Sequence, residues 1–262
     1  MPDLSVLTQR NFAGLTLSSV MEAPAWLNIF LYGDPGAGKT VLAGSSDDVP
    51  DMKPVLVVDC EGGAYSLRAF YPGVDVVRVK SLQELVDVYK TLELMDHGYK
   101  TVVLDSLSEI QKMIMGNIMT AVVLEDGERD PDVPSIREWG KLGEQMRRMI
   151  RRFRDLPMHT IFTALMDESQ DERGRRKKYP MLSGKMKKEV AGFMDIVLFV
   201  YAKHVKLDAN GNLDEKDGEL GLHRFVLSSS TDEYACKDRS SRMPEIMLDP
   251  TMTKIHTLIQ GE

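Results

Sequence analysis

The chain has 262 residues, of which 43% are hydrophobic and 28% are charged, and its formal net charge is −7. This composition is typical of a globular protein that buries a full core, and no run of about 18 apolar residues is present that could cross a membrane. The negative charge excludes nucleic-acid binding by the surface as a whole, so any such binding must be confined to a local basic patch.

The first twelve residues, MPDLSVLTQRNF, have no signal-peptide pattern, and Cys60 and Cys236 are the only cysteines. Two cysteines are too few for a disulfide framework or a cysteine zinc cluster, which is typical of proteins in a reducing compartment. We therefore expect a cytoplasmic protein with no membrane partner.

Apolar runs alternate with helical patterns along most of the chain. Runs typical of buried parallel strands occupy residues 26–32, 54–59, 101–105, 159–164 and 196–202. Apolar residues recur at helical spacing over residues 81–95, 106–124 and 135–156. Beyond residue 202 the pieces are short and strand-like, with a hairpin tip expected at residues 209–212 and a strand at residues 222–228.

This order predicts an α/β fold with a mostly parallel central sheet, helices on both faces and a C-terminal antiparallel extension. We expect a single domain over residues 26–262. Residues 1–25 precede it as a loosely attached segment and a candidate for oligomerisation.

The sequence GDPGAGKT, residues 33–40, fits the pattern GxxxxGK(S/T) directly after the first apolar run. Glycines let such a loop turn tightly, so that its backbone N–H groups can approach phosphates. Lys39 can neutralise the β- and γ-phosphates, and the Thr40 hydroxyl can ligate Mg²⁺ at the start of the next helix. The alternative is a glycine turn that matches by chance. The predicted ATP-binding residues are Gly33, Asp34, Pro35, Gly36, Ala37, Gly38, Lys39, Thr40 and Val41.

Two later strands end in acidic residues. Asp105 ends the apolar run TVVLD, where a carboxylate can hold the Mg²⁺ water shell beside the phosphates. The next residue is Ser106, so a second acid directly after Asp105 is missing and the base must come from elsewhere. Glu61, just after the strand ending at Asp59, could polarise the attacking water. The alternative is that Asp59, Glu61 and Asp105 only cap their strands.

These motifs, in this order, resemble the RecA/RadA-like recombinase core. The resemblance covers roughly residues 26–250 and looks most like compact phage ATPases that act in single-strand annealing or recombination. It implies that Glu61 is the catalytic glutamate and that Thr163, on the strand after Asp105, is the sensor of nucleotide state. The glutamine or asparagine common at the sensor position is absent. A phage origin would imply the cytoplasm of a bacterial host.

Half of residues 173–188 are Lys or Arg and none is acidic. Such clusters bind phosphate backbones, and a tyrosine among them can stack on a base. In the family that the chain resembles, a DNA-binding loop follows the sensor strand. The alternative is a solvated charge run beside an acidic one. The predicted DNA-binding residues are Arg173, Arg175, Arg176, Lys177, Lys178, Tyr179 and Lys185.

Lys237 and Arg239 form a late Lys-x-Arg pair. Such a pair can stabilise charge that develops on a γ-phosphate. Its place resembles the finger that RecA-like ATPases insert into the site of a neighbouring subunit, which implies a ring or filament of identical subunits. The alternative is a charged turn before Pro244.

The sequence thus predicts an Mg²⁺-dependent ATPase, stimulated by single-stranded DNA, that assembles on DNA for annealing or recombination. A single-strand DNA-binding protein is a candidate partner. The alternatives are a helicase- or packaging-type motor with the same core, or a nucleotide-dependent switch or kinase whose basic segment grips a phosphorylated small molecule.

Overall fold

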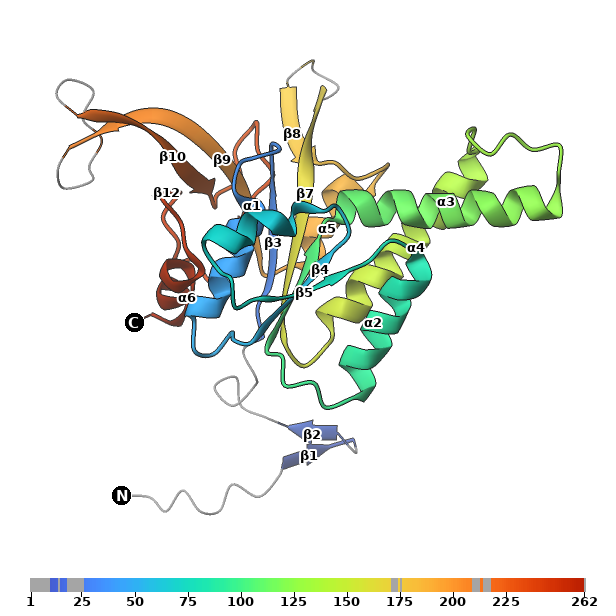
Figure 1. The fold of residues 1–262 in the computed structure, drawn as a ribbon, viewed down its shortest axis with the longest axis horizontal. Coiled ribbons are helices and arrows are strands. Elements are labelled where there is room, and N and C mark those ends of the chain that lie inside the picture. The colour runs from blue at the N-terminus through green and yellow to red at the C-terminus, as the bar shows by residue number, and fades with distance from the viewer. Residues whose placement is uncertain are drawn as a thin grey trace.

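A ten-stranded sheet organises the chain, with its strands in the order β12-β10-β9-β3-β7-β6-β4-β5, β11 beside β9 and β8 beside β7. The computed structural model in Figure 1 describes residues 10–13, 15–17, 26–170, 174, 176–208, 213 and 218–261. The parallel strands are β3 (Asn28–Gly33), β4 (Val55–Asp59), β5 (Asp75–Arg78), β6 (Thr101–Asp105), β7 (His159–Gln170) and β9 (Ile196–Leu207). The antiparallel strands are β8 (Arg176–Pro180), β10 (Glu219–Leu227), β11 (Lys237–Asp238) and β12 (Ile246–Leu248).

Helices connect most of the parallel strands. The α-helices are α1 (Lys39–Gly44), α2 (Leu82–Leu94), α3 (Leu107–Glu125), α4 (Ile136–Arg154), α5 (Met186–Phe193) and α6 (Met252–Gln260), and the 3-10 helices are η2 (Ser45–Asp48) and η3 (Gly63–Ala69). Near the N-terminus, β1 (Arg10–Phe12) pairs with β2 (Leu15–Leu17) in a separate two-stranded sheet.

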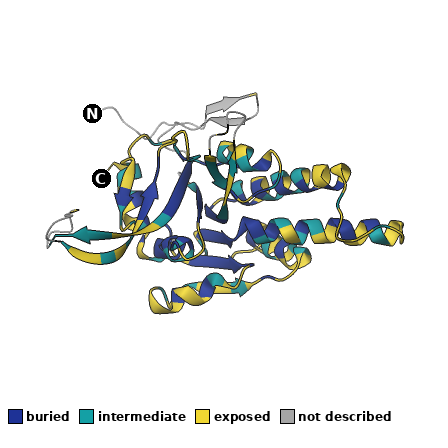
Figure 2. Cartoon of the chain, turned by 90° about the horizontal axis from the view of Figure 1, so that it is seen from above, coloured by how far each residue is buried: buried dark blue, intermediate teal, exposed yellow. Residues whose placement is uncertain are grey.

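Alternate side chains of the parallel strands enter two cores, one on each face of the sheet. On β3, Phe30 and Tyr32 belong to the core beneath α2, α3, α4 and α5, whereas Ile29 and Leu31 belong to the core beneath α1 and α6. Figure 2 shows the central strands buried, and the outer sides of the helices and the projecting hairpin of β9 and β10 largely exposed. Burial on both faces explains why these strands appear in the sequence as continuous apolar runs.

The strand order brings distant residues to one edge of the sheet. β3 lies between β7 and β9, so that Gly33 pairs with Leu165 of β7 on one side and with Val200 of β9 on the other. β7 in turn lies between β3 and β6. Asp59 at the end of β4 pairs with Asp105 at the end of β6. The carboxyl ends of these strands therefore meet beside the glycine loop, which is where ligands bind in open α/β sheets.

Arginines of α4 hold the neighbouring helix α5. Arg147 Nε donates a hydrogen bond to Glu189 Oε2 at 2.7 Å, and the Arg151 guanidinium carbon lies 5.0 Å from the centre of the Phe193 ring. A cation over an aromatic ring and a charge-assisted hydrogen bond both favour packing of α4 against α5. Arg147 and Arg151 of α4 therefore have a structural role.

The predicted fold class is confirmed, and two segments differ in detail. β7 continues to Gln170 and pairs with β8, where the sequence predicted only a basic loop. The pair extends past the sheet (Figure 1), so its side chains lack the hydrophobic alternation that marks a half-buried strand. The hairpin tip predicted at residues 209–212 lies outside the described residues. The two arms of that hairpin are β9 and β10, which pair with each other.

Gly33 supplies a test of the β3–β9 pairing. A Cβ at this position would lie 2.0 Å from the carbonyl oxygen of Val200, so the two strands would have to separate. We expect Gly33→Ala to lower the free energy of unfolding by about 1–3 kcal/mol, measured by urea denaturation. The matched control is Gly116→Ala, in an exposed part of α3 where the new Cβ would meet no atom within 4 Å beyond the backbone of its own helix and its chain neighbours. That change should be neutral or stabilise by up to about 1 kcal/mol, and equal effects of the two changes would contradict the explanation.

Candidate active site

The loop between β3 and α1 has the conformation that its glycines were expected to allow. Gly36 and Gly38 have φ angles of 77° and 100°, in the left-handed region that other residues rarely adopt. Ala37 donates its N–H to the carbonyl oxygen of Asp34 at 3.2 Å, which closes the turn. The loop therefore forms a concave backbone surface immediately before α1.

The buried side chain of Lys39 lies across this loop. Its ammonium donates hydrogen bonds to the carbonyl oxygens of Gly33 at 3.1 Å and Asp34 at 2.9 Å. Burial lowers the pKa of Lys39, while Asp105 and Glu61 act in the opposite direction. Two carboxylates thus already favour the charged ammonium that would bind phosphate.

Asp105 is held by a hydroxyl on each side. Thr40 Oγ1 donates to Asp105 Oδ2 at 2.7 Å, and Thr163 Oγ1 donates to Asp105 Oδ1 at 2.5 Å. These three residues come from α1, β6 and β7, so the contacts connect the glycine loop to two neighbouring strands. Thr163, the predicted sensor, is fully buried and contacts the carboxylate of Asp105. Its role as a sensor stays a prediction.

The two acids after β4 occupy different environments. Asp59 Oδ1 accepts the N–H groups of Gly62 at 2.6 Å and Gly63 at 3.2 Å, and Asp59 Oδ2 pairs with Arg78 Nη1 at 3.0 Å. Asp59 therefore shapes the turn into η3. Glu61 is exposed and lines the cavity above the glycine loop.

That cavity has a volume of about 320 Å³ and brings together most of the predicted nucleotide site. Its lining includes Pro35, Gly36, Gly38, Lys39, Thr40, Val41, Glu61 and Asp105. Sequence reasoning missed Ser66, Phe70, Leu165 and Arg224, which also line it. One feature of the sequence could have drawn attention to Arg224: it directly precedes the apolar end of the strand predicted at residues 222–228. The sequence does not show which strand pairs with that one, so the position of Arg224 beside the cavity could not be predicted.

The Thr40 hydroxyl and the Asp105 carboxylate together are suited to Mg²⁺. This ion takes oxygen ligands and is usually bound through one or two carboxylates, waters and substrate phosphates. Over the residues that the structure describes, no cluster of three or more His, Cys, Asp or Glu could hold a metal without such help. The site therefore fits Mg²⁺ that arrives with a nucleotide better than a permanently bound ion.

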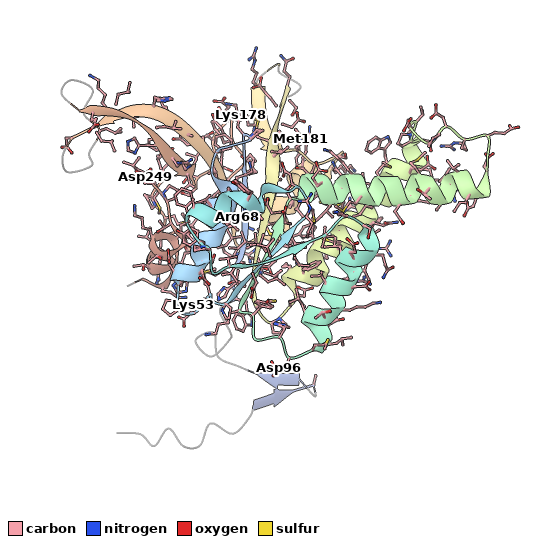
Figure 3. The ribbon with its side chains drawn as sticks, in the orientation of Figure 1. Lys53, Arg68, Asp96, Lys178, Met181 and Asp249 are labelled. Atoms are coloured by element: carbon pink, nitrogen blue, oxygen red, sulfur yellow. The ribbon has the colours of Figure 1, made fainter. Side chains whose placement is uncertain are left out.

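The predicted DNA-binding residues lie on and after the β7–β8 hairpin, except that Arg173 and Arg175 fall outside the described residues. Lys178, labelled in Figure 3, donates to the Tyr234 hydroxyl at 2.9 Å and pairs with Glu233 at 3.1 Å. These contacts, the Tyr234 hydrogen bond foremost, raise the pKa of Lys178.

The other basic residues of the hairpin region differ in how far their charge is compensated. Arg176 Nη1 lies 3.4 Å from Glu168 Oε1. Lys177 and the exposed Lys185 make no ion pair with the described part of the chain. The Tyr179 ring lies 5.5 Å from Lys187 Nζ. Tyr179 therefore lies in a cationic part of the surface, with the ammonium of Lys187 over its ring.

Lys237 and Arg239 lie away from the glycine loop of their own chain. Lys237 pairs with Val197 in the first half of β9, and its ammonium donates to the carbonyl oxygens of Ala191 at 2.9 Å and Met194 at 2.6 Å. Arg239 Nη1 contacts Asp195 Oδ1 at 2.7 Å. Lys237 thus caps the end of α5, and insertion of this pair into a neighbouring subunit stays a prediction.

The contact between Thr163 and Asp105 can be tested with conservative changes. Thr163→Val keeps the shape of the side chain but leaves a buried carboxylate without one of its donors, which costs about 1–3 kcal/mol of stability. Thr163→Ser keeps the hydroxyl, so its free energy of unfolding should fall much less. Urea denaturation measures both, and a valine variant as stable as the serine variant would show that the hydrogen bond is not important.

Comparisons with known proteins give a family match and a similar solved structure. A family model described as "AAA domain" matches residues 26–240. A solved structure described as a prototypical ATPase from the type III secretion system of pathogenic bacteria is similar at 12% identity and a TM-score of 0.42, over 70% of this chain and 52% of that one. The chain thus spans about half the length of that ATPase. No curated protein matches significantly.

None of the helices in the described ranges is long and apolar enough to span a membrane. The family match extends over the glycine loop, Glu61, Asp105 and Thr163. The chain belongs to the AAA domain family and carries a P-loop ATPase domain.

Proposed function

We propose that the chain hydrolyses ATP with Mg²⁺ and uses the nucleotide state to control binding of single-stranded DNA by the β7–β8 hairpin. One observation carries the proposal. On β7, Thr163 contacts Asp105, Leu165 lines the nucleotide cavity, and Met166 begins the pairing with β8. One continuous strand therefore connects the candidate catalytic acids to the basic hairpin.

The chemistry at the phosphates follows from the side chains that surround the cavity. Lys39 would neutralise the β- and γ-phosphates, and Thr40 and Asp105 would hold Mg²⁺, which supplies charge stabilisation when it is bound. Of Asp59, Glu61 and Asp105, Glu61 is the acid whose side chain makes no hydrogen bond or ion pair with the described residues, so its carboxylate is free to accept a proton from the attacking water. Asp59 is excluded from this role because its oxygens are used by Arg78 and two backbone N–H groups.

DNA binding is supported by charge and position. Lys177 and Lys185 make no ion pair with the described residues, and Tyr179, an aromatic ring on which a base could stack, lies among lysines. Free lysines are the groups that bind a phosphate backbone without regard to sequence. Annealing or recombination is the activity that we assign to such an ATPase.

Assembly is part of the same proposal. If Lys237 and Arg239 reach a neighbouring site, Lys237 must first leave the two carbonyl oxygens at the end of α5. A ring or filament on DNA would bring the subunits close enough for this exchange, with a single-strand DNA-binding protein as a further partner. A strand-displacing motor or a small-molecule kinase would instead show directional unwinding or phosphate transfer without DNA.

The role of Glu61 is tested by Glu61→Gln, which keeps the size of the side chain and removes the base. We expect ATP binding to be retained and turnover to fall by about 10²-fold or more. Release of phosphate measures turnover, and equilibrium binding of ATP measures affinity. Asp59→Asn is the comparison variant, because it should lower stability as well as turnover. Normal turnover in Glu61→Gln would assign the base to another residue.

The hairpin is tested by changing Lys177 and Lys185 to Ala together. Loss of two phosphate contacts should weaken binding of single-stranded DNA of any sequence and reduce the slope of log affinity against log salt by about 1.4. Filter binding at several salt concentrations measures both quantities. Lys90→Ala on α2, a lysine with only a long contact to Asp87, is the control and should bind as the unchanged protein does. An unchanged slope in the double variant would place the DNA elsewhere.

A further inference from the structure

Arg224 is a cation in the nucleotide cavity that neither a motif nor the family match assigns a role. It pairs with Ala202 of β9, two residues beyond Val200, which pairs with Gly33. The Arg224 position is therefore just past the edge of the sheet where the glycine loop lies. The side chain lines the cavity together with Lys39 and Glu61.

The alternation of β10 directs this side chain to the glycine loop. Phe225 and Leu227 pack in the core beneath α2 to α5, whereas Val226 packs in the core beneath α1. Residues two apart on a strand share a face, so Arg224 lies on the side of Val226. α1 is the helix that follows the glycine loop, and Arg224 therefore faces the loop that would hold phosphates.

The contact with the loop is close. If Gly38 carried a Cβ, that atom would lie 2.7 Å from both Cδ and Nε of Arg224. The side chain thus crosses directly over Gly38, the residue that precedes Lys39. The absence of a side chain at Gly38 therefore serves the loop conformation and also makes room for Arg224.

Asp249 fixes the backbone of Arg224. The Arg224 N–H donates to Asp249 Oδ1 at 3.1 Å, and the carbonyl oxygen of Arg224 accepts the N–H of Asp249 at 2.7 Å. Figure 3 labels Asp249 beside β10 and β12. Asp249 is thus a positioning residue that holds the strand where the side chain of Arg224 can reach the cavity.

The guanidinium of Arg224 makes no ion pair or hydrogen bond with the described part of the chain. Other arginines near the sheet are occupied: Arg78 pairs with Asp59, Arg239 pairs with Asp195, and Arg242 donates to the carbonyl oxygen of Ile259. The guanidinium of Arg224 is thus free to bind a ligand in the loop. Two N–H groups of a guanidinium can bind two phosphate oxygens at once, so this group suits a phosphate.

We propose that Arg224 binds the polyphosphate of the nucleotide held by its own subunit, from the side opposite Lys39. This inference rests on the nucleotide site of the proposed function and adds a cation to it. It implies that one protomer supplies positive charge from two directions, from α1 and from β10. The phosphate chain would then be contacted within a single subunit before any neighbour contributes.

Equilibrium binding of two probes, ATP and inorganic tripolyphosphate, tests the proposal. Arg224→Gln removes the charge and keeps most of the stem, and Arg224→Lys keeps the charge without the bidentate fork. We expect the glutamine variant to lose about tenfold in affinity for both probes, as for loss of one charge-assisted hydrogen bond. The affinity of the lysine variant should fall between those of the unchanged protein and the glutamine variant. The loss of affinity in the glutamine variant should be smaller at high salt. Arg137→Gln, on the exposed surface of α4, is the matched control and should bind normally.

Each result has a distinct meaning. If Arg224→Gln binds tripolyphosphate normally but ATP weakly, the side chain contacts the base or ribose and the proposal is wrong. If the glutamine variant binds both probes normally, the stem alone matters and the proposal is also wrong. Lys39→Ala separates this from the broader function: loss of binding in Lys39→Ala with none in Arg224→Gln leaves the nucleotide site intact and removes only Arg224 from it.

Mixing experiments decide which subunit Arg224 serves. A mixture of Arg224→Gln and Lys39→Ala protomers contains no chain with both cations. If Arg224 acts within its own subunit, ATP binding in the mixture should stay at the average of the two variants measured separately. Recovery above that average would show that Arg224 reaches a neighbouring site, which would overturn the assignment to its own subunit.

Discussion

The carboxylate of Asp105 is the group on which the site depends. The carboxylate accepts one hydrogen bond from the hydroxyl of Thr40 in the glycine loop and one from the hydroxyl of Thr163 on the adjacent strand. The backbone carbonyl oxygen of Asp105 accepts the N–H of Cys60, just after β4. Burial makes each of these contacts costly to lose, because an unpaired carboxylate in a core is strongly destabilising. The side chain of Asp105 thus connects β6 to α1 and β7, and its backbone connects β6 to the end of β4. The parts that would bind phosphate, metal and water are organised by the same contacts that stabilise the sheet.

The order of the strands explains why this arrangement is possible. Because β7 lies between β3 and β6, it is a direct neighbour of the strand that leads into the glycine loop and of the strand that ends at Asp105. Because β7 then continues to Gln170, the same strand that contacts the candidate catalytic acid also carries the basic hairpin. Thr163 and the basic hairpin are therefore connected by one continuous strand.

Much of this could be predicted, because the informative patterns are local. The glycine loop is a contiguous motif, and the parallel strands are buried on both faces, so they appear as apolar runs in the sequence. Residues whose meaning depends on distant pairing could not be assigned in the same way. Arg224 reaches the loop only through the register of β10 with β9 and of β9 with β3. Lys237 fits a finger motif by spacing, yet the carbonyl oxygens at the end of α5 attract its ammonium, as helix C-termini attract cations.

The turn after β4 connects the candidate active site to the edge strand β5. Arg78 lies at the end of β5, the last strand of the sheet, and its side chain is 42% exposed while that of its partner Asp59 is 7% exposed. Asp59 in turn holds the two glycines that follow Glu61. A solvent-facing arginine on an edge strand is therefore connected through Asp59 to the turn that carries Glu61. Under the proposed role of Glu61, a change at Arg78 would alter turnover from a surface position outside the cavity.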